Sequence, residues 1–330
     1  MNKRLIRLVT LVLSVALVSL TLVLAGCAPR QTQEEGFKFA RSVEIVVPWG
    51  TGGGADTTVR AFAPALEKAL GVAVVVNNVS GGGGVLGFEH AYRQPADGYT
   101  FMLSTQSHLL AYFQGHTTVN PIEAFVPVVR LVHDTNILVA SAKAPFKSFD
   151  ELLAYVRANP GVVKAGVLTV TGLDAFMIRQ TFQQAGVDVP LVPFSTGAEL
   201  NAAILGGHVH LAVVGPSEVK GLLEAGDMQA IIVAAEKRIS MLPEVPATGE
   251  KGIASYLGPM RGIFAKNGTP EAAIKAFEAA AVTAHASAEF QAWMKANALD
   301  QRPAFANSAD LAVIWAEQST TLKALYEQSK

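Results

Sequence analysis

Residues 43–60 combine a strand, a glycine-rich turn and a helix, and such a combination can hold an anion. The apolar run Val43–Val47 leads into Pro48–Gly54, which contains four glycines and Trp49. Glycines let backbone N–H groups approach a ligand closely, and the start of a helix adds unpaired donors and the positive end of the helix dipole. We therefore expect this loop to bind a carboxylate or a phosphate.

The same loop also fits a dinucleotide-binding pattern, because Gly50–Ala55 matches G-x-G-x-x-A. Such sites need an acidic residue roughly 20 positions later, at the end of the second strand, to hold the ribose hydroxyls. Here the second strand ends in Asn77-Asn78, and the Gly-Lys-Ser/Thr of a P-loop is missing. A carboxylate is therefore favoured over a nucleotide.

The sequence contains no common signature of a hydrolase or a metal site. Neither a G-x-S-x-G elbow nor an H-E-x-x-H helix occurs. His208 and His210 alternate as two residues on one face of a strand would, but no further ligand follows at metal-binding spacing. We expect no catalytic residue, no metal and no cofactor.

The first 26 residues have the pattern of an export signal. Lys3, Arg4 and Arg7 precede an apolar run over 8–24, and the small pair Ala25-Gly26 comes directly before Cys27. This arrangement resembles a bacterial lipobox, in which the cysteine is diacylated and becomes the new N-terminus. We expect a lipoprotein signal peptide over 1–26, lipidation at Cys27 and an extracytoplasmic, lipid-anchored protein. A transmembrane anchor or an ordinary cleavage site is the alternative.

The chain from Cys27 onward has the length and charge expected of a two-domain exported protein. Its 304 residues suggest two domains at roughly 150 residues each. It carries 23 basic and 27 acidic residues, a formal charge of −4, so nucleic acid is not an expected partner. Residues 27–42 are rich in Pro, Gln, Glu and Gly and predict a flexible tether.

Short β-branched runs alternate with helix-length segments from Val43 onward, which predicts α/β lobes built on parallel sheets. We expect two lobes joined near residues 134 and 259, one formed by 43–134 plus 259–330 and the other by 135–258. Ser148 and Thr269 are expected helix N-caps, each at the start of a helical segment. The cleft between the lobes is the expected binding site. The expected strands span 43–47, 72–77, 100–104, 125–131, 136–141, 164–167, 191–194, 208–214, 229–235 and 261–265.

Several segments together resemble the extracytoplasmic solute receptors of the tripartite tricarboxylate transporter (TTT) system, the Bug family. Val47–Asp56 matches the V-P-[FW]-x-x-G-G-x-x-D loop with one additional glycine, and Asn78–Gly87 matches the N-x-x-G-G-x-x-G segment. The resemblance extends over about residues 43–280. Further matching segments are Asp97–Thr100, Pro193-Phe194, Leu205–Gly207, Glu224–Gly226, Leu242–Thr248 and Gly268–Pro270.

The resemblance implies a fold of the periplasmic-binding-protein type II-like class, with two α/β lobes and a ligand cleft between them. It also implies a monomer that performs no chemistry, closes on a small organic acid or amino acid, and delivers it to a large and a small membrane subunit. Three or four charge-assisted hydrogen bonds of roughly 1.5–3 kcal/mol each could hold a carboxylate without an arginine. The ligand-binding residues that it implies are Trp49, Thr51, Gly52, Gly53, Asp56, Gly82, Gly83, Ser104, Thr105, Thr169, Thr171, Asp174, Ser195, Thr196, Gly197 and Gly215.

One segment departs from the family pattern and bears on the ligand. Family members usually have small and hydroxyl residues leading into a histidine or serine where this chain has Val170–Asp174. An acidic Asp174 would repel a second carboxylate or receive an ammonium group; alternatively, it turns away and caps the following helix.

The alternative function is that of a ligand-presenting sensor protein for a signalling partner or, less readily, of an exported enzyme on the same fold. Neighbouring genes for membrane subunits would favour transport.

Overall fold

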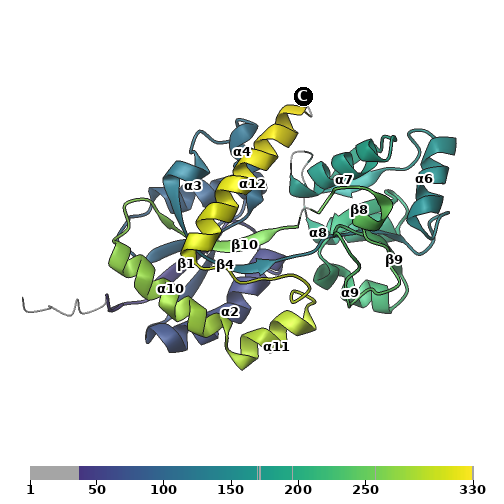
Figure 1. Cartoon of the computed structure of the whole chain (residues 1–330). Helices are drawn as coiled ribbons and strands as arrows, with labels where there is room; N and C mark the ends of the chain where they lie inside the picture. Colours follow the sequence, from purple (N-terminus) through teal and green to yellow (C-terminus); the bar gives the residue numbers. More distant parts are fainter. Residues whose placement is uncertain (1–36, 169, 171, 195, 257, 329–330) are drawn as a thin grey trace, which may run out of the picture. The chain divides into compact units, whose positions relative to one another are not determined.

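The computed structural model describes residues 37–168, 170, 172–194, 196–256 and 258–328. The expected signal peptide, Cys27, most of the expected tether, and Thr169, Thr171 and Ser195 lie outside the described residues. Two five-stranded sheets with helices on both faces form two α/β lobes (Figure 1).

The first sheet has the strand order β2-β1-β3-β10-β4. β1 pairs in parallel with β2 and β3, whereas β10 runs antiparallel to both β3 and β4. The strands span Val74–Asn78 (β2), Val43–Val47 (β1), Thr100–Ser104 (β3), Met260–Lys266 (β10) and Phe125–His133 (β4).

The second sheet has the order β7-β6-β8-β5-β9, with β6 parallel to β7 and β8 and β5 antiparallel to β8 and β9. The expected parallel pairing therefore holds for β1 with β2 and β3 and for β6 with β7 and β8, but not for the pairings made by β5 and β10. β5 continues directly from the first sheet and β10 returns from the second, so no crossover helix makes either strand parallel to its neighbours. The strands span Leu191–Pro193 (β7), Ala165–Val167 (β6), Leu211–Val214 (β8), Ile137–Ser141 (β5) and Met228–Val233 (β9).

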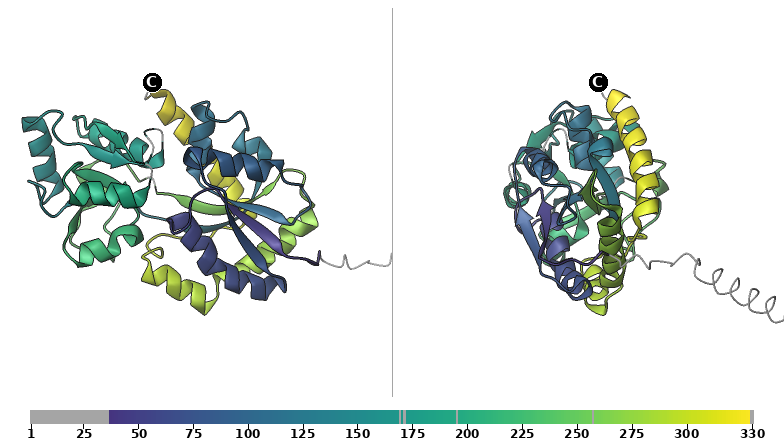
Figure 2. Two further views of the ribbon diagram at one scale, coloured as in Figure 1. Left: turned by 180° about the vertical axis from the view of Figure 1, so that it is seen from behind. Right: turned by 90° about the vertical axis from the view of Figure 1, so that its left-hand side faces the viewer.

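Helices cover both faces of the first sheet because alternate strand residues point to opposite faces. On one face Phe101 of β3 stacks on Phe277 of α10, with ring centroids 3.8 Å apart, and α2 packs against α10 and α11. On the other face Met102 joins an apolar cluster with residues of α3, α4 and α12 (Figure 2). The helices span Gly54–Leu70 (α2), Val85–Arg93 (α3), Gln106–Phe113 (α4), Pro121–Ala124 (α5), Glu271–His285 (α10), Ala288–Ala296 (α11) and Ser308–Gln328 (α12).

The second sheet is covered in the same way. Apolar residues of α6 and α7 pack on one face, and those of α8 and α9 pack on the other. These helices span Phe149–Ala158 (α6), Leu173–Gln184 (α7), Gly197–Leu205 (α8) and Pro216–Glu224 (α9). Two short 3-10 turns complete the elements, η2 at Gly82–Gly84 and η3 at Gly249–Lys251. Within the described residues, no helix combines the length and apolarity needed to cross a membrane.

The structure confirms one local prediction and corrects two others. The N-cap at Ser148 is confirmed, because the Ser148 hydroxyl accepts a hydrogen bond from the Glu151 N–H at 3.2 Å. The cap at Thr269 is wrong, because α10 begins at Glu271 after Pro270. The strand position of His208 and His210 is also wrong, since β8 begins at Leu211. His210 instead accepts a hydrogen bond from the Lys164 N–H on Nδ1 at 3.2 Å.

Candidate functional site

A cavity of about 500 Å³ is lined by residues of both lobes. Its volume is typical of small-molecule sites. The first lobe and its connections contribute Trp49, Gly50, Ser80, Gly81, Gly82, Gly83, Gly84, Ser107 and Pro259. Asn136 and the second lobe contribute Leu168, Gly172, Leu173, Asp174, Gly197, Leu200, Asn201, Val213, Val214, Gly215 and Glu218.

The structure brings only part of the predicted site to this cavity. Six predicted residues line it: Trp49, Gly82, Gly83, Asp174, Gly197 and Gly215. Seven other described residues of the prediction do not: Thr51, Gly52, Gly53, Asp56, Ser104, Thr105 and Thr196. The remaining three, Thr169, Thr171 and Ser195, lie outside the described residues.

Asp56 uses a backbone donor of the first glycine loop. Its Oδ2 accepts a hydrogen bond from the Gly52 N–H at 2.8 Å, and its Oδ1 accepts one from Arg60 Nε at 2.8 Å. Burial alone would raise the pKa of Asp56, but the hydrogen bonds from Arg60 and Gly52 outweigh it and lower the pKa. Asp56 therefore stabilises the loop by accepting a hydrogen bond from the Gly52 N–H, which was expected to donate to a ligand.

The second glycine loop presents its backbone to the cavity. Gly81, Gly82, Gly83 and Gly84 all have positive φ, which only glycine adopts at low cost over such a run. Gly82 and Gly83 are exposed in the cavity wall, and neither η2 nor α3 has an acidic residue in its first turn. Successive backbone N–H groups in such a turn form a concave site for anions.

Trp49 stands in front of a buried aromatic stack. His108 lies between Trp49, at 5.1 Å between ring centroids, and Phe88, at 4.8 Å. Burial lowers the pKa of His108 to about 4, so the imidazole is neutral at pH 7. Ser104 Oγ lies 2.8 Å from His108 Nδ1, and Thr105 caps α4 by accepting a hydrogen bond from the Ser107 N–H at 3.2 Å. Both hydroxyls therefore have partners within the first lobe.

Helices α7, α8 and α9 of the second lobe each have an acid in the first turn: Asp174, Glu199 and Glu218. Asp174 Oδ2 accepts a hydrogen bond from the Leu168 N–H at 2.9 Å, and Glu218 Oε1 accepts one from the Gly215 N–H at 3.3 Å. Desolvation raises the pKa of both carboxyls, and Asp134 and Asp174 raise that of Glu218 further. Asp174 is half-buried and lines the cavity, so it holds the Leu168 backbone in place and also faces the cavity.

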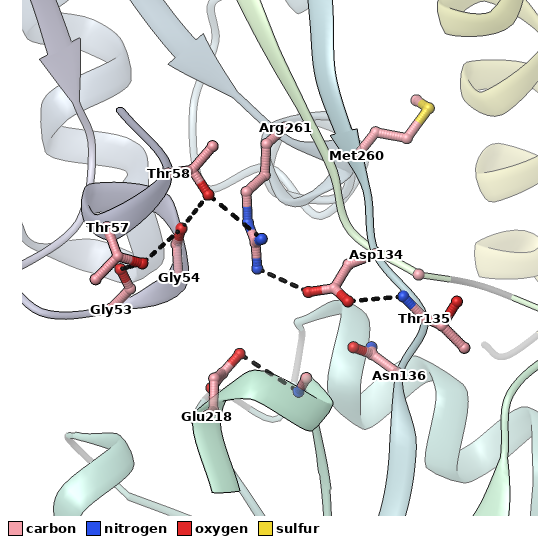
Figure 3. Close-up of polar contacts among 12 residues, drawn as sticks. Gly53, Gly54, Thr57, Thr58, Asp134, Thr135, Asn136, Glu218, Met260 and Arg261 are labelled. Atoms are coloured by element: carbon pink, nitrogen blue, oxygen red, sulfur yellow. Dashed lines mark hydrogen bonds and ion pairs between the residues drawn. The ribbon is translucent and has the colours of Figure 1, made fainter. Parts of the chain in front are cut away.

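A buried ion pair lies where the chain crosses between the lobes (Figure 3). Arg261 Nη2 is 2.9 Å from Asp134 Oδ2, and the two side chains are 5% and 0% exposed. Two glycines let helix starts approach this pair: a methyl on Gly54 would lie 2.5 Å from Arg261 Nη2, and one on Gly215 would lie 3.0 Å from Asp134 Oδ2. This pair was not predicted from the sequence. The one available sign was that Asp134 and Arg261 lie at the two predicted connections between the lobes.

Asn136 follows this crossing and was also missed. It is only 6% exposed, and it lines the cavity. Its Nδ2 donates to the Met177 thioether, with 3.1 Å between nitrogen and sulfur. Among the described residues, no side-chain hydrogen bond is made to its Oδ1, so this oxygen can still accept one.

The chain shares sequence and fold with known solute receptors. The profile of the tripartite tricarboxylate transporter family receptor matches residues 58–330. Protein BugT of Bordetella pertussis is 31% identical over 235 residues, which cover 70% of this chain and 72% of BugT.

Two solved structures share the fold at lower identity. The periplasmic binding protein BugD superposes with a TM-score of 0.79 at 24% identity, over 88% of this chain and 98% of BugD. MatC of Rhodopseudomonas palustris, solved with bound malate, superposes with a TM-score of 0.77 at 23% identity, over 87% of this chain and 99% of MatC. Because the family profile spans most of the sequence, the chain belongs to the tripartite tricarboxylate transporter receptors of the Bug family.

Proposed function

We propose that this protein captures a small organic acid in the interlobe cavity, outside the cytoplasm, and delivers it to the membrane subunits of a TTT-type transporter. Membership of the receptor family supports the transport role. The bound malate of MatC supports a carboxylate as the ligand. In this proposal the protein binds its solute without chemistry and is held at a membrane by lipid on Cys27.

The observation that carries the carboxylate assignment is the distribution of acids over the helices that begin at the cavity. Helices α7, α8 and α9 of the second lobe have an acid in the first turn, whereas α3 and α4 of the first lobe have none. The positive ends of α3 and α4 are therefore not neutralised by their own side chains. Ser80, the glycines of 81–84 and Ser107 lie at these two helix starts and line the cavity.

In the proposed complex, one ligand carboxylate rests on this first-lobe wall and Trp49 covers it. Backbone N–H groups near Gly82 and Gly83 and the Ser107 hydroxyl would donate to the carboxylate oxygens. Each such bond contributes roughly 1.5–3 kcal/mol. Gly197 and Gly215 allow the second-lobe helix starts to come near the same ligand.

Calorimetry on the purified protein tests the proposal with a panel of mono- and dicarboxylates and a nucleotide. The informative variant is Gly82→Asp, matched by Gly82→Asn. Both side chains tolerate the left-handed backbone at Gly82, where φ is 59° and a Cβ would have ordinary contacts. Only aspartate adds a negative charge, so we expect at least about tenfold weaker acid binding than with asparagine. Nucleotide binding without acid binding would refute the proposal.

A further inference from the structure

Resting on the proposed function, we propose that the second-lobe wall recognises an ammonium group, so that the ligand is an amino acid held with its carboxylate on the first lobe. Asp174, Glu218 and Asn136 Oδ1 are the acceptors assigned to this group.

The charge of the cavity wall favours a ligand with a cationic part. Asp174 and Glu218 line the cavity, and no described lining residue is Lys, Arg or His. The nearby Arg261 side chain is 5% exposed and paired with Asp134. A simple dicarboxylate would therefore place its second charge against two acids without a basic partner in the wall.

Asn136 provides an independent observation. The thioether of Met177 can only accept a hydrogen bond, so the amide nitrogen faces the sulfur, and the oxygen is the remaining acceptor of a side chain that lines the cavity. A ligand N–H would donate to this oxygen.

The two carboxylates keep capacity for the same group. Glu218 uses Oε1 for the Gly215 N–H, and Asp174 uses Oδ2 for the Leu168 N–H. Glu218 Oε2 accepts no hydrogen bond from the described residues and stays available to a ligand. The Asp174 carboxylate also has the N–H groups of Ala175 and Asp174 nearby, but its two oxygens offer about four lone pairs, and the residue lines the cavity. Figure 3 shows Glu218 and Asn136 drawn beneath the Arg261–Asp134 pair, reached from α9 and from the crossing strand. An ammonium group has three N–H donors, one for each acceptor.

The wall is thus polarised across the cavity. The first-lobe helix starts without acids offer donors, and the second-lobe side offers acceptors. A zwitterion matches both sides at once, and one ligand bridging both walls would also favour closure of the lobes. The proposal therefore fixes the orientation of the ligand, with its carboxylate on the first lobe and its ammonium group on the second.

The test compares amino acids with their deaminated analogues by calorimetry on the full exported protein. The probes are glutamate with glutarate, leucine with 4-methylpentanoate, and phenylalanine with 3-phenylpropionate. In at least one pair, the amino acid should bind more than about tenfold tighter, the gain expected from a charge-assisted hydrogen bond. The variants are Asp174→Asn, which keeps an acceptor for Leu168, and Glu218→Gln.

The control variant is Glu224→Gln on the same helix as Glu218. Glu224 is exposed and its nearest cation is Lys220 at 3.9 Å, so the preference should not change. The double variant D174N/E218Q should lose the preference for the amino acid and bind glutarate more tightly than the unaltered protein does. A merely damaged fold would weaken both ligands together.

Three outcomes of these binding experiments would contradict the ammonium site or the proposed function. Deaminated acids that bind as well as their amino partners in every pair would overturn the ammonium site and leave carboxylate capture intact. A preference that survives in D174N/E218Q would also overturn it. Absence of binding by every acid, amino or not, would contradict the proposed function as well.

Discussion

The Ser104 hydroxyl lies 2.8 Å from Nδ1 of His108, behind the Trp49 wall of the cavity. His108 is 1% exposed, and its Nε2 has no hydrogen-bond partner among the described residues. A charged imidazole in this position would lack both water and a nearby carboxylate. The Ser104–His108 bond therefore belongs to the support of Trp49, and the support depends on a neutral histidine.

We predict that His108 makes the protein less stable as the pH falls from 6.5 towards 4. The pKa of His108 is about 4 in the native state against 6.5 for an ordinary histidine, so the unfolded chain binds the extra proton in this window. The loss should total about 3 kcal/mol. Urea unfolding gives the free energy of unfolding at pH 7.5 and at pH 4.5. The decrease in this free energy between the two pH values should be smaller in His108→Gln than in the unaltered protein.

His133 provides the comparison for this experiment. Burial, with Arg302 and Arg130 nearby, lowers its pKa to about 3, so it contributes a loss of the same sign and a residual slope should remain in His108→Gln. His116→Gln, at an exposed position, controls for the change of residue type. An unchanged pH dependence in His108→Gln would show that folding does not lower the pKa of His108.

The buried Arg261–Asp134 pair should be costly to break from one side. Arg261→Met would leave the Asp134 carboxylate buried without its cation, which typically costs about 3–5 kcal/mol of unfolding free energy. Arg41→Met is the matched control, because Arg41 and Asp97 form an exposed pair worth less than about 1 kcal/mol. Urea denaturation measures both losses.

The double variant R261M/D134N separates the charge from the packing. Removing both charges should recover much of the stability lost in Arg261→Met, because no unpaired charge remains. Equal losses in the single and double variants would mean that Arg261 acts through its contacts with Thr58 and Gly54 instead.

Local patterns in the sequence were sufficient to predict several elements. β1 and β3 match their predicted bounds, and Ser148 caps its helix as expected, because apolar runs and caps depend on neighbouring residues. The antiparallel strands β5 and β10 were not predicted as such, since their direction depends on how the chain passes between sheets.

Only some of the residues that line the cavity could be predicted from the sequence. Trp49 lies in a loop after a strand, and Gly82 and Asp174 lie in the first turns of η2 and α7, where glycine and acid patterns are visible in the sequence. Glu218 and Ser107 look like ordinary first-turn residues of helices, so nothing local marked them. Asp134 and Arg261 are 127 positions apart, and only the return of β10 brings them together.

Two cavity glycines should respond differently to alanine. A methyl on Gly215 would lie 2.9 Å from Glu218 Oε1 and 3.0 Å from Asp134 Oδ2, so Gly215→Ala should cost roughly 1–3 kcal/mol. A methyl on Gly197 meets nothing within 4 Å, and Gly197→Ala in a helix should stabilise by about 0.4–1 kcal/mol. Urea unfolding distinguishes them, and equal stability of the two variants would contradict the crowding at Gly215.

Gly197→Ala also tests the cavity itself. The added methyl would point into open space at the start of α8, where a ligand is proposed to approach. We expect weaker acid binding in a protein that is as stable as before or more so. Calorimetry with the tightest-binding acid would show this, and unchanged affinity would place the ligand away from α8.

Cys27→Ser should release the protein from membranes if lipid on Cys27 is the attachment. The residue follows Ala25-Gly26 at the end of the apolar run, in the position that bacterial lipoprotein signals modify. Two acyl chains give stable attachment, whereas serine accepts no thioether-linked lipid. Fractionation of cells with metabolic labelling by a fatty acid measures both the location and the modification. If Cys27→Ser stayed in the membrane fraction, the uncleaved apolar segment 8–24 would be the attachment.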